Sequence, residues 1–419
     1  MKHLTRIAVA IFLVAGCAPK RTPSPEYANE PWASLKTFGD DVHRAAEMAK
    51  NSSAAGNDRD NADGGRYIAE ILRQQLDLGF FADPDHPVFR PQFPESAHTG
   101  LVNPDNLYEN TRIRPGVDYL VRGTRGSTAD VVLQVYEERP GVKGSLRGVS
   151  TLSLDDLVFE DDGSFEVHVG PTPHEKNWLR TDETSGLLLI RWSHSDWANE
   201  RAGRAEIVPK KDPGQPSAPP NVGEVSRDLR DSGAAIPDAG QFWLDFVGRI
   251  RFFTGKNEVM KPRSTGGEGL EGQVSAMGQF ALRDDQALIV TVPKADTRYQ
   301  GLQLGNYWFD ALEWANRQTS LAAGQSHLAS DGRYHYVISK KDPGVVNWLD
   351  TTGLEQGLFF LRYQGLRRPL TDAENPSVRL VGIDEVRTAL PADTPTIGAQ
   401  ARREQLAQRQ LQLQRRYGR

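Results

Sequence analysis

The chain has 419 residues, enough for two or three domains with full hydrophobic cores. Hydrophobic residues make up 38% and aromatic residues 8%, a globular composition, and a net charge of −5 gives no overall sign of nucleic-acid binding. The one cysteine, Cys17, excludes an intrachain disulfide and a cysteine-rich zinc site, and it confines thiol catalysis to that residue.

The first 17 residues have the pattern of a signal peptide. A basic start precedes an apolar run over 7–15, which is too short to cross a bilayer core of about 30 Å. The box from Val14 to Cys17 resembles that of a bacterial lipoprotein, in which cleavage before Cys17 is followed by lipidation of its thiol. The alternative is an ordinary signal peptide that contains a cysteine.

We therefore predict a lipid anchor at Cys17 and a location in the bacterial cell envelope, with palmitate or a similar acyl chain in the membrane. Ala18 follows the cysteine where an aspartate would be expected in an inner-membrane lipoprotein, so the outer membrane is favoured, with the protein facing the periplasm or the surface.

Residues 18–31 are rich in proline and polar side chains and predict a flexible tether. Residues 32–99 predict a helical region, with a polar spacer over 50–65 between two helices. The apolar positions of these helices recur every three or four residues and are expected to face a core. They are Trp32, Leu35, Phe38, Val42, Ala45 and Ala49, then Ile68, Ile71, Leu72 and Leu76.

Residues 100–207 predict a first β domain. Short β-branched or aromatic runs bounded by turn residues are typical of a β-sandwich or jelly roll, and they lie at 117–122, 131–136, 165–169 and 187–192. The proline-rich residues 208–223 predict a linker.

The rest of the chain repeats this order. Residues 224–283 predict a helical and Gly-rich connector, and 284–370 a second β domain with strands at 287–292, 302–304, 334–338 and 358–363. An extended segment over 371–394 then precedes a basic helical tail over 395–419. The predicted fold class is mainly β with helical additions, built from two tandem sandwich-like domains.

A long internal repeat relates the two β domains. The segment Asn177-Trp178-Leu179 recurs as Asn347-Trp348-Leu349 at an offset of 170, and Arg191 recurs as Arg362 at 171. Leu133-Gln134-Val135 answers Leu302-Gln303-Leu304 at 169. We predict a structural role for the shared Asn, Trp and Arg. In the second copy Asp350 is a local carboxylate that could pair with Arg362, whereas the first copy has Arg180 at the equivalent position. Because Asp350 is not repeated, it remains a candidate functional residue.

Three segments carry a resemblance to a known family. They are "NPDNLYENTRIRPGVDYLVRG", "GSFEVHVGPTPHEKNWLR" and "DGRYHYVISKKDPGVVNWLDTTGLEQGLFFLRY". The chain resembles the bacterial domain-of-unknown-function family numbered 1214, often found with a companion family numbered 1254, over roughly residues 60–370. The resemblance implies a β-rich, jelly-roll-like envelope or secreted protein and supplies no catalytic residues.

No catalytic motif is complete in the sequence. The glycines of 267–272 fit G-x-G-x-x-G but follow no strand, and no Walker A or H-E-x-x-H string occurs. The stretch 324–328 lacks the last glycine of a nucleophile elbow. We predict no cofactor and no metal site.

Aromatic side chains beside amide and guanidinium groups favour a ligand with apolar faces and hydroxyls, such as a sugar. The alternative for each is core packing or turn chemistry. The candidate binding residues are Asn106 and Tyr108 in the first half, and Tyr307, Trp308, Arg317, Gln318, Gln325 and Asp350 in the second.

The tail carries six arginines against one glutamate and predicts a helix with a solvated face. One hypothesis is contact with an anionic lipid or envelope polymer, and the other is a solvated or protein-binding helix. For the whole chain we predict an envelope lipoprotein that binds a glycan, lipid or protein partner and no nucleic acid. The alternative is a hydrolase or lyase on an envelope or imported substrate.

Overall fold

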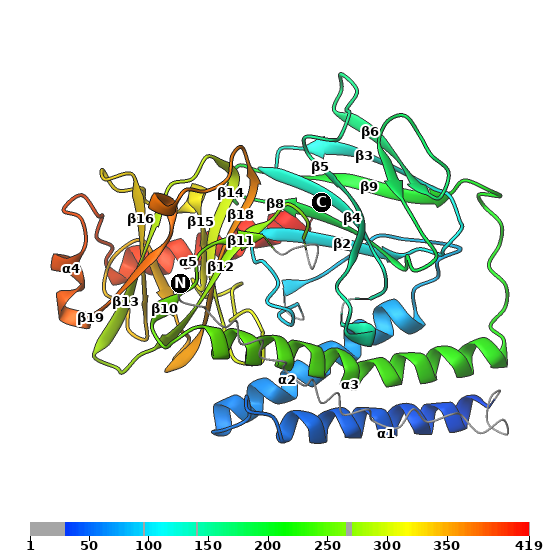
Figure 1. The fold of residues 1–419 in the computed structure, drawn as a ribbon, viewed down its shortest axis with the longest axis horizontal. Helices are drawn as coiled ribbons and strands as arrows, with labels where there is room; N and C mark the ends of the chain where they lie inside the picture. The colour runs from blue at the N-terminus through cyan, green and yellow to red at the C-terminus, as the bar shows by residue number, and fades with distance from the viewer. Residues whose placement is uncertain (1–29, 95–96, 140, 265–269, 419) are drawn as a thin grey trace, which may run out of the picture.

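Two β-sandwiches lie side by side, and three helices run along one edge of the pair (Figure 1). This computed structural model describes residues 30–94, 97–139, 141–264 and 270–418. Cys17 and the glycines at 267 and 269 lie outside the described residues. None of the helices within the described ranges is long and apolar enough to cross a membrane.

The first sandwich packs a five-stranded sheet, ordered β1-β2-β8-β4-β5, against a four-stranded sheet, ordered β7-β6-β3-β9. Every pair is antiparallel except β6 with β7, and alternate side chains such as Val121, Val167 and Ile190 fill the core. The strands are β1 (Arg90–Pro91), β2 (Asn106–Arg112), β3 (Tyr119–Gly126), β4 (Asp130–Tyr136), β5 (Gly148–Ser153), β6 (Ser164–Gly170), β7 (Trp178–Arg180), β8 (Leu187–Ser193) and β9 (Ala202–Pro209).

The second sandwich repeats this topology strand for strand. Its sheets are ordered β10-β12-β18-β14-β15, with β11 added beside β12, and β17-β16-β13-β19, where β16 and β17 are again the parallel pair. The strands are β10 (Glu258–Val259), β11 (Arg263–Ser264), β12 (Val274–Ala281), β13 (Gln286–Pro293), β14 (Thr297–Gly305), β15 (Ser320–Ala322), β16 (Arg333–Ser339), β17 (Trp348–Asp350), β18 (Gln356–Leu366) and β19 (Ser377–Gly382).

The predicted fold class and the duplication are therefore confirmed, but the bounds 284–370 of the second domain are wrong. Strands β10 to β12 fall in the predicted connector 224–283, and β19 falls in the predicted extended segment 371–394. Strand β12, "VSAMGQFA", escaped prediction because a glycine and small residues interrupt its alternation. Residues 210–221 are exposed and form neither helix nor strand. The predicted linker bounds 208–223 are too wide at both ends, because β9 runs to Pro209 and a helix begins at Val222.

Five α-helices and several short helical turns complete the described chain. Buried side chains of three long helices, including Ala45, Tyr67 and Ile236, form a shared helical core. The helices are α1 (Pro31–Lys50), α2 (Asp58–Gln75), α3 (Val222–Phe253), α4 (Val386–Ala389) and α5 (Ala399–Tyr417). The turns are η2 (Leu76–Phe80), η4 (Val142–Gly144), η5 (Ala323–Gln325), η6 (Asp372–Glu374) and η7 (Ile383–Glu385).

Two expectations for the helices are wrong. Trp32 is 76% and Leu35 49% exposed, so the first turn of α1 does not face the core. The predicted spacer 50–65 ends at Asn57, since α2 begins at Asp58, where Asn57 and Asp60 form a reciprocal capping box. The polar run after Asn57 is thus the start of a helix.

Candidate functional site

The basic tail forms helix α5, which lies across both sandwiches. Three of its arginines, spaced by seven residues, point inward and are 5%, 5% and 2% exposed. Arg402 binds Asp342 at 2.9 Å and the carbonyl of Val345, both in the second domain. Arg416 donates to the carbonyl of Pro104 at 3.0 and 3.1 Å, at the edge of the first domain.

The middle arginine, Arg409, anchors α5 at the seam between the domains. Its guanidinium donates to the carbonyl of Trp314 at 2.8 Å and to the hydroxyl of Ser320 at 2.9 Å. The guanidinium carbons of Arg409 and Arg416 lie 4.1 and 4.4 Å from the centroid of the Trp197 ring, a cation–π arrangement on a residue of the first domain.

A buried carboxylate, Asp105, complements this charge. It accepts hydrogen bonds from the indole of Trp197 at 2.9 Å and from the phenol of Tyr299 at 2.7 Å. Burial raises the pKa of Asp105, although the bond from Tyr299 and the charges of Arg409 and Arg416 oppose the rise. Burial also lowers the pKa of Arg409 to about 10, against the charge of Asp105.

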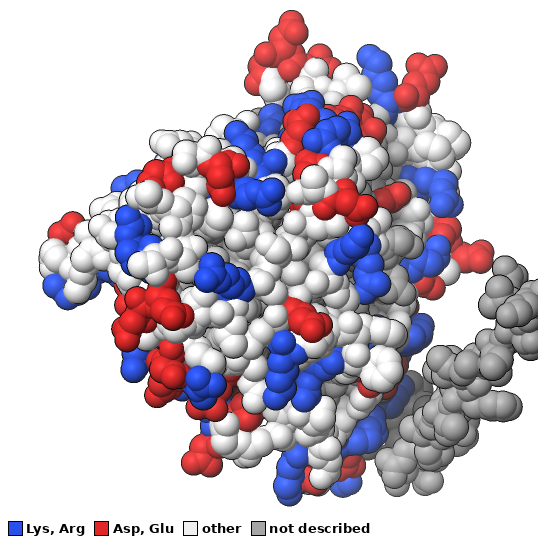
Figure 2. All heavy atoms as spheres, turned by 60° about the vertical axis from the view of Figure 1, so that its left-hand side comes forward, with Lys and Arg blue, Asp and Glu red and all other residues white. Residues whose placement is uncertain are grey.

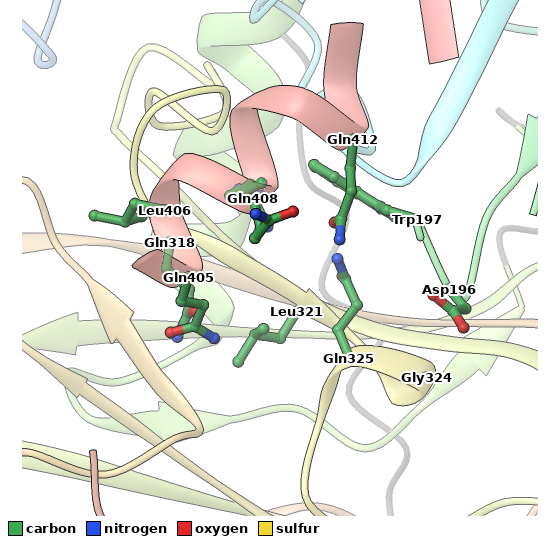
Figure 3. Close-up of a pocket in the computed structure, with 11 residues that line it drawn as sticks. Asp196, Trp197, Gln318, Leu321, Gly324, Gln325, Gln405, Leu406, Gln408 and Gln412 are labelled. Carbon is green, nitrogen blue, oxygen red and sulfur yellow. The ribbon is translucent and has the colours of Figure 1, made fainter. Parts of the chain in front are cut away.

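A pocket of about 220 Å³ opens between α5 and the second domain. Figure 3 shows its side chains converging from α5, from η5 and from the loop after β8. Five of its lining side chains are glutamines. The lining residues are Asp196, Trp197, Gln318, Leu321, Gly324, Gln325, Gln405, Leu406, Gln408, Arg409 and Gln412.

The five amides divide into a fixed and an available group. Gln318 donates to the carbonyls of Val346 and Trp348, the oxygen of Gln325 accepts from Ala322 at 3.2 Å, and that of Gln405 accepts from Arg402 at 2.7 Å. Within the described residues, the amides of Gln408 and Gln412 make no hydrogen bond to protein. Such amides offer both donors and acceptors to a ligand.

The predicted binding residues do not form one site. Gln318 and Gln325 line the α5 pocket. Trp308 is 2% exposed and packs against α2, with its indole donating to the carbonyl of Asp60 at 2.9 Å, so it is no exposed platform. Tyr307 donates to Gln279 at 3.1 Å and faces Arg251.

The remaining candidates are also engaged within the protein. Asn106 is 2% exposed at the start of β2, and the hydroxyl of Tyr108 accepts from the backbone of Asn103 at 3.0 Å. Asp350 binds Arg317 at 2.7 Å and caps the backbone of Thr352. The expectation that Asp350 pairs with Arg362 is therefore wrong.

The repeated arginines pair with repeated glutamines instead. Arg191 donates to the side-chain oxygen of Gln134, and Arg362 to that of Gln303. Both glutamines come from the repeated segments on β4 and β14, directly beside the arginine strands β8 and β18. A neutral partner suffices because each arginine also finds a second acceptor, the hydroxyl of Tyr136 for Arg191 and the carbonyl of Leu101 for Arg362.

The repeated asparagines and tryptophans make matching bonds in the two domains. Asn177 bonds both the N–H and the carbonyl of Val158, at 2.8 Å each, and Asn347 does the same with His327 at 2.9 and 2.8 Å. Each tryptophan indole donates to a carbonyl at the end of the preceding strand, Trp178 to Gly170 and Trp348 to Ser339. These contacts are what a structural role predicts.

Acidic and histidine side chains of the second domain that could serve a hydrolase or lyase have separate partners. Asp342 binds Arg402, His327 lies 3.8 Å from Asp393, and His335 lies 2.9 Å from Asp331. None of these lines the α5 pocket. Over the described part of the chain, no three His, Cys, Asp or Glu side chains gather as a metal site would need.

Sequence reasoning missed Trp197 and the glutamines of α5. Trp197 and these glutamines lie far from β14 in the sequence. The pattern that could have indicated them is the seven-residue spacing of Arg402, Arg409 and Arg416, because this spacing places the three arginines on one buried face of the tail helix. The glutamines of α5 that line the pocket, Gln405, Gln408 and Gln412, lie at the edge of that buried face.

Comparison with known proteins gives a fold relationship. No family profile and no curated protein matches the sequence, so the resemblance to family 1214 stays a prediction. The crystal structure of an uncharacterised protein from Burkholderia cenocepacia is similar with a TM-score of 0.78 and 24% identity, over 87% of this chain and 100% of that one. The VPA0106 protein from Vibrio parahaemolyticus aligns over 83% of this chain and 100% of that one, with a TM-score of 0.39 and 11% identity.

The fold and the pocket define a class of protein. It is a tandem β-sandwich protein in which a carboxyl-terminal helix crosses the domain seam and walls an amide-lined pocket. The similarity to the Burkholderia cenocepacia protein shows that fold alone.

Proposed function

We propose that the protein is a bacterial envelope lipoprotein that binds a glycan in the α5 pocket. The single observation that carries the glycan is the set of five glutamines around one cavity, of which Gln408 and Gln412 have amides unused by the described protein. Sugar hydroxyls both donate and accept hydrogen bonds, so paired amide groups match them better than they match an apolar ligand.

A glycan array with the soluble chain lacking residues 1–17, followed by calorimetry on the strongest glycan, tests this proposal. We expect Gln408→Ala combined with Gln412→Ala to weaken binding about tenfold or more, since each lost hydrogen bond costs about 1 kcal/mol. Gln414→Ala is the matched control, because Gln414 is exposed on the same helix and does not line the pocket. Equal binding by the double variant and the control would contradict the pocket, and an array with no signal would contradict the glycan.

The anchor is proposed from the sequence around Cys17. Helix α1 begins at Pro31, fourteen positions beyond Cys17, a stretch that could reach at most about 50 Å if extended. Growth with a labelled fatty acid should label the wild-type protein and leave Cys17→Ser unlabelled. Label on both forms, or on neither, would count against the anchor.

Fewer arginines of the basic tail are available to an anionic partner than the sequence suggests. Arg402, Arg409 and Arg416 are buried, while Arg403 and Arg415 are exposed. On the face shown in Figure 2, basic and acidic side chains are interspersed. An anionic lipid or polymer would therefore meet the exposed arginines of α5 and not all six.

A further inference from the structure

A second, smaller cavity lies between α2 and the loop that follows β14. Its volume is about 50 Å³, and it shares no lining residue with the α5 pocket. Its walls hold four carboxylic acids, two arginines and one histidine. The lining residues are Arg59, Asp63, Arg66 and Glu70 of α2, then His98, Asn306, Asp310, Ala311, Leu312 and Glu313.

One of the acids, Glu70, is fully occupied by the protein. Its Oε2 accepts from the backbone of His98 at 2.9 Å and of Thr99 at 3.1 Å, and its Oε1 lies 2.8 Å from Nδ1 of the His98 ring. Glu70 is 7% exposed, and these bonds fix the segment before β2 to α2. Glu70 is thus a source of negative charge with no bonding capacity to spare.

Asp310 is the opposite case. It is 6% exposed, and within the described residues its Oδ1 is buried without a hydrogen-bond partner. The backbone of Asp310 is held by Asn306 at 3.0 Å and by a bridge to Thr99, so this part of the loop is fixed beside the cavity. A buried acceptor with no donor costs about 1–3 kcal/mol, which indicates that something else supplies the donor.

The balance of charge indicates which kind of donor. Four carboxylic acids, Asp63, Glu70, Asp310 and Glu313, face two arginines. Arg59 is engaged with Asp63 at 3.1 Å, and the other, Arg66, is 59% exposed and 4.0 Å from Glu70. Acceptors and negative charge are in excess, so a cationic group with N–H donors is favoured.

The size of the cavity limits that group. The cavity of about 50 Å³ is much smaller than the α5 pocket of about 220 Å³, so it suits a small group, such as an ammonium group with its attached carbon, better than a sugar ring. The remainder of a ligand would lie outside, beside the exposed side chains of Arg59 and Arg66.

We propose that this cavity binds the ammonium end of a primary amine, with the carboxyl group of Asp310 as its acceptor and the charges of Glu70, Asp63 and Glu313 around it. The site is independent of the glycan pocket, and its ligand is an amine-bearing small molecule or side chain.

Binding at this site is coupled to a proton. Burial and then the charge of Glu70 raise the pKa of Asp310 well above its ordinary value, so the unliganded carboxyl holds its proton to a higher pH than an exposed aspartate does. The other ionisable groups facing it are Asp63, Arg66, Tyr67 and His98 with Arg59 and Glu313 at the cavity wall. When the ammonium group enters, Asp310 ionises and its proton passes to the buffer. Affinity is therefore expected to rise with pH.

Calorimetric titration of the soluble chain with methylammonium chloride tests the site, in two buffers of different ionisation enthalpy at pH 6 and pH 8. Tetramethylammonium chloride is the control ligand, since it has the charge and no N–H donor. We expect methylammonium to bind, tighter at pH 8 by about tenfold or more, with a proton released, and tetramethylammonium to give no binding. Equal behaviour of the two ligands would overturn the proposal and leave a buried water only.

Three variants sharpen the result. Asp310→Asn should weaken methylammonium binding about tenfold or more and abolish proton release, whereas Asp161→Asn, the same change at an exposed turn, should alter neither. Arg66→Ala should strengthen binding about two- to fivefold at low salt, because it removes a like charge from the mouth. If Asp310→Asn does not fold, methylammonium binding by Arg66→Ala decides the question. Unchanged or weaker binding by Arg66→Ala would overturn the proposal.

Discussion

The hydroxyl of Ser193 donates a hydrogen bond to the side-chain oxygen of Gln364 at 2.8 Å, and both residues are buried in the seam between the sandwiches. At the offset of 171 that relates Arg191 to Arg362, these are equivalent positions on β8 and β18. The two copies thus touch through the same point of the same strand, as identical subunits do in an isologous contact. The duplication supplies both the domains and part of the surface that joins them.

The repeated asparagines predict different responses to the same substitution. Asn177 has a left-handed backbone with φ of 46°, whereas Asn347 is not among the residues of positive φ. Replacing Asn347 by alanine removes two side-chain hydrogen bonds, and replacing Asn177 removes three, because Asn177 also donates to the carbonyl of Glu166 at 2.9 Å. Each change should lower the free energy of unfolding by about 2 kcal/mol or more in urea titrations. Glycine should recover about 1 kcal/mol relative to alanine at 177, where it relieves strain, and nothing at 347.

Hydrogen exchange followed by mass spectrometry locates the effect. Faster exchange is expected at Val158 in the Asn177 variants and at His327 in the Asn347 variants, whose amides lose their acceptors. If glycine and alanine behaved alike at Asn177, backbone strain would not distinguish the two copies.

Two neighbouring glycines of α2 form a matched pair. A Cβ at Gly64 would lie 2.5 Å from a ring carbon of Trp308, whereas a Cβ at Gly65 has nothing within 4 Å. Gly64→Ala should therefore destabilise the protein by about 1–2 kcal/mol, since overpacking outweighs the gain in helix propensity. Gly65→Ala should stabilise it by up to about 1 kcal/mol. Thermal unfolding of both variants checks this, and equal shifts would contradict the packing of Trp308 on α2.

The Gly64 contact also explains what the sequence could not reveal. Local patterns predict the strands 131–136 and 187–192 and the two-copy organisation, because alternation and turn residues are encoded within each copy. The partner of Trp308 lies 244 residues away on α2, so no local pattern distinguishes its burial from an exposed binding platform. The same holds for the α5 pocket, whose walls come from three distant segments.

The interpretation of the basic tail shows a second limit. Charge counting predicts a solvated helix, but Arg402, Arg409 and Arg416 donate hydrogen bonds to carbonyls and lie over the faces of Trp348 and Trp197. Arginine is suited to this because its flat group both stacks and donates in a plane. Composition cannot separate that use of arginine from a solvated one.

His194 predicts a loss of stability in weak acid. Its Nδ1 lies 3.2 and 3.1 Å from the carbonyls of Asp105 and Trp192, so the proton sits on Nδ1, and Nε2 is buried without a partner among the described residues. Burial and then the charge of Arg416 lower the pKa of His194 well below its ordinary value. The unfolded chain then binds a proton near pH 6.5 that the folded chain refuses, so stability falls as pH drops below that value, by up to about 1.4 kcal/mol per unit.

Urea unfolding of the wild type and His194→Gln between about pH 5 and pH 8 isolates this contribution. The raised pKa values of the neighbouring Asp105 and Glu200 have the opposite sign, but both groups are present in the two proteins and their contributions cancel in the difference. The stability difference should favour His194→Gln increasingly toward low pH. Parallel curves would show that His194 is not the group that titrates.

Replacing Arg409 tests how strongly α5 is attached to the two domains and whether the pocket depends on that attachment. Removing its side chain in Arg409→Ala leaves the carbonyl of Trp314 and the hydroxyl of Ser320 without a donor and uncovers the ring of Trp197, at a cost of about 2–4 kcal/mol. Arg415→Ala changes an exposed side chain of the same helix and should cost less than about 0.5 kcal/mol. Tryptophan fluorescence should shift to longer wavelength, and protease should remove α5, only in the first variant.

Because α5 supplies Gln405, Gln408 and Gln412 to the pocket, Arg409→Ala should also lose the glycan that Arg415→Ala still binds. Retention of the glycan after α5 is cleaved would place the binding site elsewhere.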